Sequence, residues 1–139
     1  RHFSAVTSFE VLEHVHDPLV FIEEAFSKAG TSTIIFSTEL FEREPPKPSD
    51  WWYYSFNTGQ HISFYQKKTL QAMADRLSLG LYSNNNIHII TNKRLNKIYF
   101  RLMTSQFSNL IDYYVKYKMN SKTFSDHEAV TKGCPLIKR

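Results

Sequence analysis

Three residues with chemically reactive side chains follow the first apolar run of the chain: Glu10, Glu13 and His14. They stand at positions i, i+3 and i+4, so one helical turn would project them from a single face. His61 is a fourth candidate, because an imidazole titrates near neutral pH and can act as a general base. Two alternatives stay open: Glu13 and His14 only hold a loop by hydrogen bonding, and His61 is a structural histidine at the entry to a helix.

An aromatic segment is the second feature with possible chemistry. Residues 39–60 contain three prolines, which oppose regular structure, and four consecutive aromatic residues, Trp51, Trp52, Tyr53 and Tyr54. Their flat faces could stack on a substrate such as a sugar, a quinone or a base. The alternative is ordinary packing of a long loop onto the edge of a sheet.

The elements that position these residues follow from the apolar pattern. Residues 3–9 are apolar and β-branched, which predicts a buried strand. Asp17 and Pro18 predict the start of a helix, since Asp is a preferred N-cap and Pro is tolerated at the first helical position, and Gly30 predicts its end. A strand over residues 33–38 completes a strand–helix–strand unit, which predicts a parallel pair.

Three further elements are expected after the aromatic segment. Residues 61–65 lead into a helix that ends at Gly80. Residues 81–83 and 87–91 flank three consecutive asparagines, which predicts an antiparallel hairpin. A long amphipathic helix is expected over residues 95–119.

Two motifs resemble one enzyme family. The segment from Ala5 to Pro18, which reads AVTSFEVLEHVHDP, resembles the motif after the fourth strand of class I S-adenosylmethionine-dependent methyltransferases. The stretch GQHISFY at residues 59–65 is similar to the stretch that follows the fifth strand in many of these enzymes. The hairpin also fits, because the seventh strand of that family is antiparallel to the rest. The resemblance covers roughly residues 3–92.

The resemblance implies S-adenosylmethionine as cofactor, with Ser8, Phe9 and Glu10 at a wall of its pocket, beyond the carboxyl end of a strand. The family's glycine-rich loop is absent from this sequence, whose four glycines are far apart. We therefore expect the chain to be the C-terminal half of a methyltransferase, from the fourth strand onward. Alone it would be inactive, and it could self-associate through an exposed sheet edge.

The resemblance also implies a possible divalent metal ion. Glu10, Glu13, His14 and His61 match the E-x-x-E-H…H metal site of some family members, including small-RNA 2′-O-methyltransferases and quinone-ring O-methyltransferases. In such a site the metal orients a substrate hydroxyl and lowers its pKa. Two carboxylates and two imidazoles are compatible with Mg²⁺, Mn²⁺ or Zn²⁺.

Length, composition and charge limit the classes of protein to which the chain can belong. The 139 residues, 42% of them hydrophobic, suit one folded domain and exclude a disordered chain. No apolar run approaches the ~18 residues of a membrane span. A single cysteine, Cys134, cannot form an internal disulfide, so a cytoplasmic location is expected. Residues 1–64 carry four basic and nine acidic groups, a net −5, and residues 65–139 carry thirteen and four, a net +9.

We therefore expect an α/β chain with a partial Rossmann-like methyltransferase fold: a mixed sheet, a C-terminal antiparallel hairpin and a long C-terminal helix. Residues 1–92 would form the C-terminal half of the methyltransferase domain and residues 93–139 a helical extension. The expected function is methyl transfer from S-adenosylmethionine to a small-molecule or sugar/nucleotide acceptor. The alternative is a non-catalytic methyltransferase-like domain that binds nucleic acid or a partner protein through its basic half.

Overall fold

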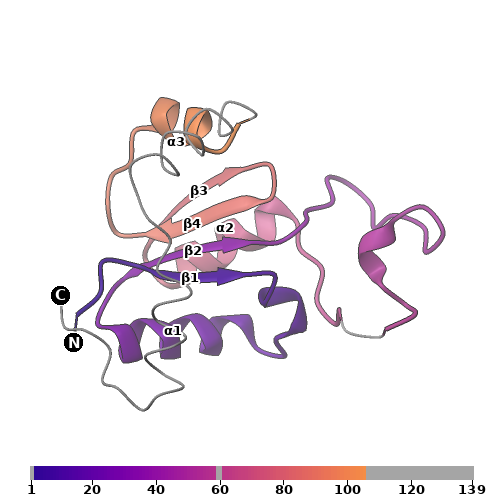
Figure 1. Cartoon of the computed structure of the whole chain (residues 1–139), viewed down its shortest axis with the longest axis horizontal. Helices are drawn as coiled ribbons and strands as arrows, with labels where there is room; N and C mark the ends of the chain where they lie inside the picture. Colours follow the sequence, from indigo (N-terminus) through magenta and orange to yellow (C-terminus); the bar gives the residue numbers. More distant parts are fainter. Residues whose placement is uncertain (1, 59–60, 106–139) are drawn as a thin grey trace, which may run out of the picture. The chain divides into compact units, whose positions relative to one another are not determined.

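The β-branched segments form one four-stranded mixed sheet. In the computed structural model, which describes residues 2–58 and 61–105, β1 (Val6–Phe9) pairs in parallel with β2 (Thr33–Ser37). β2 pairs antiparallel with β4 (Ile87–Thr91), and β4 pairs antiparallel with β3 (Gly80–Asn84). Figure 1 shows the resulting order, β1-β2-β4-β3. The parallel pair and the closing hairpin are both confirmed.

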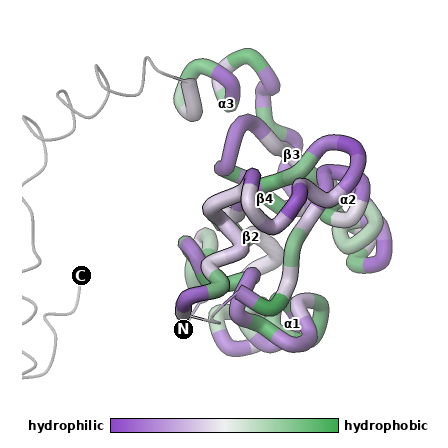
Figure 2. The backbone as a smooth tube through the Cα atoms, turned by 90° about the vertical axis from the view of Figure 1, so that its right-hand side faces the viewer, coloured by the Kyte–Doolittle hydropathy of each residue, from purple (hydrophilic) through white to green (hydrophobic). Residues whose placement is uncertain are grey.

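Helix α1 (Pro18–Ala29) has the predicted ends. The Asp17 carboxylate accepts hydrogen bonds from the backbone N–H groups of Leu19 and Val20, both at 3.1 Å. Gly30 closes the helix in the left-handed region, at φ 63°, and a Cβ there would clash with the His2 ring. Hydrophilic and hydrophobic stretches follow one another along α1 in Figure 2, as expected for a helix with one buried side.

Helix α2 (Lys67–Arg76) ends earlier than predicted. Ser78, at φ 56°, takes the left-handed conformation that we assigned to Gly80, and the N–H of Leu79 bonds to the carbonyl of Ala74. Gly80 is the first residue of β3 and pairs with Thr91. The prediction that Gly80 stops the helix is therefore wrong, because a serine supplies the turn and the glycine enters the sheet.

The long C-terminal helix is the second correction. Helix α3 covers only Lys97–Met103. It begins after Asn96, whose side chain accepts from the N–H groups of Ile98 and Tyr99. The helix ends at Thr104. The Thr104 hydroxyl donates to the backbone carbonyl of Phe100, and the Thr104 carbonyl accepts from the Asn84 side chain. The rest of the predicted helix, residues 106–119, lies outside the described residues, as does the second unit of the chain, residues 106–139.

The core lies between one face of the sheet and the two helices α1 and α2. Ile34, Phe36 and Ile90 point from the sheet into it, and Ile22 and Leu70 meet them from the helices. Among the described elements, β1 has a strand neighbour on one side only, so its outer edge is available for pairing. No helix in the described part of the chain has the length and apolar character needed to cross a bilayer.

Candidate functional site

The site lies beyond the carboxyl ends of the parallel strands β1 and β2. Glu10 follows β1 in a left-handed conformation, at φ 51°, which is uncommon for a residue other than glycine. Its N–H donates to the Ser37 hydroxyl at 2.9 Å, and that hydroxyl donates to the Glu10 carboxylate. The end of β1 is therefore fixed to the end of β2, and the Glu10 side chain is engaged there.

A short 3₁₀ turn, η1 (Leu12–His14), carries the next reactive residues. The carbonyl of Glu13 accepts from the N–H groups of Ile62 and Ser63, at 2.8 and 3.0 Å. The Tyr65 hydroxyl donates to the carbonyl of Leu12 at 2.8 Å. These three bonds join η1 to the segment that follows the aromatic loop, which brings residues nearly fifty positions apart into contact.

As a result, Glu13, His14 and His61 form one cluster. One possible metal-ligating atom from each lies within 4.8 Å of the others. The rings of His14 and His61 meet edge to face, with centroids 4.8 Å apart. Glu13 is completely buried, and neither oxygen of its carboxylate makes a hydrogen bond of ordinary length, although its charge acts on the nearby Tyr53 hydroxyl. Since a buried carboxylate without such a bond is costly, this residue is the most unusual feature of the site.

Glu10 does not join this cluster. The spacing i, i+3, i+4 predicts one face of an α-helical turn, but Glu10 is left-handed and η1 starts two residues later as a 3₁₀ turn. The Glu10 carboxylate accepts from Ser37 instead. The predicted four-residue set therefore becomes a set of one carboxylate and two imidazoles.

A hydrogen bond between Nδ1 and a backbone carbonyl fixes the orientation of the His61 ring. Its Nδ1 lies 2.6 Å from the carbonyl oxygen of Tyr53. A carbonyl can only accept, so Nδ1 carries the proton and the neutral ring keeps a lone pair on Nε2. The structure also shows that His61 lies in an extended segment before Gln66, the N-cap of α2, and not directly at the helix entry.

The four aromatic residues predicted to face a substrate have different environments. Tyr53 is fully buried, with its ring centroid 4.5 Å from that of His61, and therefore offers no face to a ligand. Trp51 is partly buried against Tyr53 and Tyr54, and the Tyr54 hydroxyl donates to the carbonyl of Pro46. Trp52 is 77% exposed. Of the four, Trp52 is the one free to stack on a substrate in this conformation.

Burial and charge both act on the Tyr53 hydroxyl. Burial raises the pKa of Tyr53 to about 12, and the negative charge of Glu13 adds to this rise, while hydrogen bonds from Thr38 and from the backbone of Glu39 oppose it. Tyr53 is thus protonated at neutral pH. Its hydroxyl lies 3.1 Å from the Thr38 hydroxyl, at the end of β2.

Two further residues lie near the site: Thr38, which the sequence places at the carboxyl end of a strand, and His88, and no role was expected for either. His88 is fully buried, and its Nε2 lies 3.1 Å from the Thr38 carbonyl oxygen. Burial lowers the pKa of His88, which keeps the ring neutral, with the nearby charge of Lys67 acting in the same direction. The sequence signal was a polar residue at an inward position of an apolar strand, opposite Phe36 in the sheet register.

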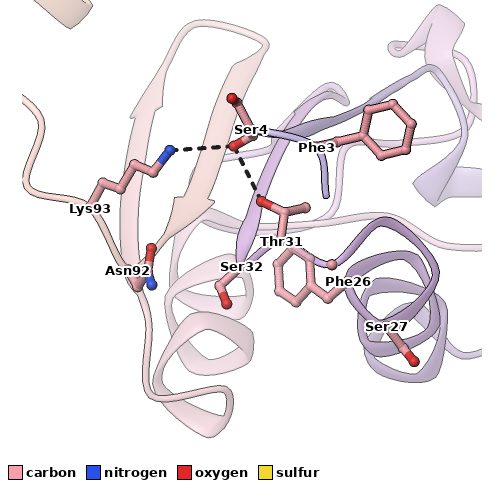
Figure 3. A pocket seen from close by; sticks show the side chains of 9 residues that line it. Phe3, Ser4, Phe26, Ser27, Thr31, Ser32, Asn92 and Lys93 are labelled. Atoms are coloured by element: carbon pink, nitrogen blue, oxygen red, sulfur yellow. Dashed lines mark hydrogen bonds between the residues drawn. The ribbon is translucent and has the colours of Figure 1, made fainter. Parts of the chain in front are cut away.

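A cavity of about 510 Å³ lies at the opposite end of the sheet. Figure 3 shows it between the segment before β1 and the segments next to β2 and β4, where the Ser4 carbonyl accepts from Thr31 and Lys93. None of the predicted site residues lines it. Ligands of open α/β sheets bind beyond the carboxyl ends of the strands, so this cavity is not the expected functional site.

Comparison with known proteins identifies the family. A family model described as a methyltransferase domain matches residues 1–83, the part of the chain that contains β1, β2, both large helices and the whole Glu13, His14 and His61 cluster. No curated protein sequence gives a significant match. Because the match covers more than half of the 139 residues, the chain belongs to the methyltransferase domain family.

Proposed function

We propose that Glu13, His14 and His61 form the acceptor side of a methyl-transfer site. Membership of the family implies S-adenosylmethionine-dependent methyl transfer. The acceptor would be a small molecule or a sugar or nucleotide with an oxygen, nitrogen or carbon nucleophile. One observation carries the assignment of these residues: their donor atoms converge within 4.8 Å around a buried carboxylate that makes no hydrogen bond of ordinary length.

The cofactor would lie against Ser8, Phe9 and Glu10. The Ser8 hydroxyl is buried without a hydrogen-bond partner, and the Phe9 ring is 53% exposed. Successive residues of a strand point to opposite faces of the sheet, so the exposed Phe9 ring would contact the apolar part of the cofactor, and the Ser8 hydroxyl lies on the core face. Glu10 contributes by fixing the end of β1 to Ser37. When bound, S-adenosylmethionine supplies the electrophilic methyl group of its sulfonium.

His61 is the residue best placed to take a proton from the acceptor. Its Nδ1 proton is held by the Tyr53 carbonyl, so Nε2 is the basic atom. The half-buried ring packs against Tyr53 and His14, which restricts its rotation. Removal of a proton from an O–H or N–H group would expose the lone pair that attacks the methyl carbon.

The same cluster would also suit a divalent metal ion. One carboxylate and two imidazoles favour Mn²⁺ or Zn²⁺ over Mg²⁺, which prefers oxygen ligands. The Glu13 carboxylate fits this assignment, since a cation would offset its buried charge. A bound ion would supply Lewis acidity that lowers the pKa of an acceptor hydroxyl.

A calorimetric titration with Mn²⁺ or Zn²⁺ separates the two roles. We expect the 139-residue chain to bind one of these ions, Glu13→Gln to bind it at least ~10-fold more weakly, and His16→Ala, which changes an exposed histidine of the same loop, to bind it as wild type does. If no ion binds, the metal role is excluded and the cluster acts through His61 as base. If the wild-type rate of methyl transfer then also survives His61→Ala, the assignment of the cluster is wrong.

The alternative function is nucleic-acid or protein binding without catalysis. Lys93, Arg94, Lys97 and Arg101 are all exposed, which favours an electrostatic surface. A change of these four residues to Gln would abolish salt-dependent RNA binding if this function is correct. It would leave metal binding at Glu13 unchanged.

A further inference from the structure

A buried chain of hydrogen bonds connects the β3–β4 hairpin to His61. We infer that Thr38 and Tyr53 are positioning residues, which hold the His61 ring in the tautomer that carries the proton on Nδ1 and leaves Nε2 unprotonated. The inference rests on the proposed function of His61. It assigns to Tyr53 a role different from the substrate contact that the sequence predicted.

The first link of this chain fixes Thr38 to the hairpin. The N–H of Thr38 donates to the carbonyl of Asn86 at 3.2 Å, and the Thr38 carbonyl accepts from Nε2 of His88 at 3.1 Å. Nδ1 of His88 lies 2.9 Å from the Ser83 hydroxyl, so both ring nitrogens are engaged. Thr38 and His88 are both completely buried, where each such bond resists exchange with water.

The second link joins Thr38 to Tyr53. Their hydroxyl oxygens are 3.1 Å apart, and Tyr53 is completely buried. Tyr53 belongs to the 3₁₀ turn η2 (Trp52–Tyr54), which has no side-chain cap at its start and ends at Ser55, at φ 50°. A turn of three residues has few internal bonds, so contacts with the rest of the fold must set its orientation. The Thr38 hydroxyl and the backbone of Glu39 both hydrogen-bond to the Tyr53 hydroxyl, and of these two the Thr38 hydroxyl is the side-chain partner.

The third link is the one that acts on His61. The backbone carbonyl of Tyr53 accepts from Nδ1 at 2.6 Å, and the two rings pack with centroids 4.5 Å apart. A hydrogen bond to one ring nitrogen determines which tautomer is present and where the other nitrogen points. Loss of the Thr38–Tyr53 bond would free the turn to move its carbonyl, and His61 would then populate both tautomers.

Spectroscopy of the imidazole nitrogens tests this directly. Histidine labelled with ¹⁵N in the 139-residue chain gives separate Nδ1 and Nε2 shifts, and His61→Gln identifies those of His61. At pH 8 we expect wild type to show a protonated Nδ1 and an unprotonated Nε2. In Thr38→Val and Tyr53→Phe, which each remove one hydroxyl, we expect the two shifts to converge and the affinity for Mn²⁺ or Zn²⁺ to fall roughly 10-fold.

Two further variants serve as controls. Thr38→Ser keeps a hydroxyl and should restore the wild-type shifts. Tyr54→Phe removes a hydroxyl of the same turn that donates to the Pro46 carbonyl, and it should leave the shifts unchanged. Urea unfolding confirms that each variant is folded before its spectrum is read. Wild-type shifts in folded Thr38→Val and Tyr53→Phe overturn the inference. If wild type binds no metal ion, only the proposed metal role is excluded. The tautomer inference is still tested, because the ¹⁵N shifts of the His61 ring report the tautomer without a metal ion.

Discussion

The Nδ1 atom of His61 lies 2.6 Å from the backbone carbonyl of Tyr53, eight residues earlier in the chain. This contact means that the aromatic loop and the candidate base form one structural unit. The aromatic side chain that the sequence places beside a substrate instead packs behind the histidine, at a ring distance of 4.5 Å. What reaches the site from Tyr53 is its backbone oxygen, which no pattern of residue types reveals.

Replacement of His61 is expected to affect turnover more than cofactor binding. In an active methyltransferase that contains this chain, His61→Ala should lower the rate of methyl transfer by about 10²-fold or more, because it removes the base or ligand at the acceptor. The affinity for S-adenosylmethionine should change little, since Ser8 and Phe9 form its proposed wall. Release of S-adenosylhomocysteine measures the rate of methyl transfer, and equilibrium titration measures the affinity for S-adenosylmethionine. His16→Ala is the matched control, and an unchanged rate in His61→Ala would leave the residue with a structural role only.

Binding of S-adenosylmethionine by the 139-residue chain should be weak. The sequence has four glycines, at 30, 59, 80 and 133, and therefore no glycine-rich loop to hold the cofactor. Only one wall, at Ser8 and Phe9, is expected to contribute. Calorimetry should give a dissociation constant well above the low-micromolar range. A low-micromolar constant would mean that this chain forms a complete cofactor site without such a loop.

The sequence predicted the sheet well because its signals are local. Asp17, Pro18 and Gly30 mark both ends of α1 by capping chemistry alone, and the asparagine run marks the hairpin. The errors at Gly80 and in the helix from residue 95 have one cause. Ser78 ends α2 with a left-handed backbone, and Thr104 ends α3 with a hydroxyl that donates to the carbonyl of Phe100. Serine and threonine take these roles only when the surrounding structure favours them.

The site was predicted in part for a similar reason. The family resemblance grouped Glu13, His14 and His61, and in the structure one possible ligand atom of each lies within 4.8 Å of the others. Glu10 was grouped with them by helical spacing, but its left-handed backbone directs the carboxylate to Ser37. Thr38 and His88 belong to no motif, and only the bonds of Thr38 to Tyr53 and to His88 connect them to the aromatic loop.

The cap of α1 offers a test of the fold that is independent of the site. Asp17→Ala removes two hydrogen bonds to the first turn of the helix and should lower the free energy of unfolding by about 1 kcal/mol. Asp50→Ala is a matched control, because its exposed carboxylate accepts from the neighbouring Ser49 hydroxyl and caps no helix, and it should cost less than about 0.5 kcal/mol. Urea unfolding measures both. Equal losses would show that the cap contributes no more than a surface carboxylate.

The buried His88 should make stability depend on pH. Burial lowers its pKa below the ordinary value of 6.5, with the charge of Lys67 adding to this and the bond to the Thr38 carbonyl opposing it. Below pH 6.5 the unfolded chain therefore binds a proton at this residue that the folded chain does not, so the free energy of unfolding falls as pH decreases towards the folded pKa. Above pH 6.5 this contribution to stability is fully present.

We expect urea unfolding to show a clear loss in the free energy of unfolding between pH 7.5 and pH 5.5 in wild type, and a smaller loss in His88→Gln. His16→Gln, at an exposed position, should keep the wild-type loss. The same loss in wild type and in His88→Gln would show that His88 is not the group responsible.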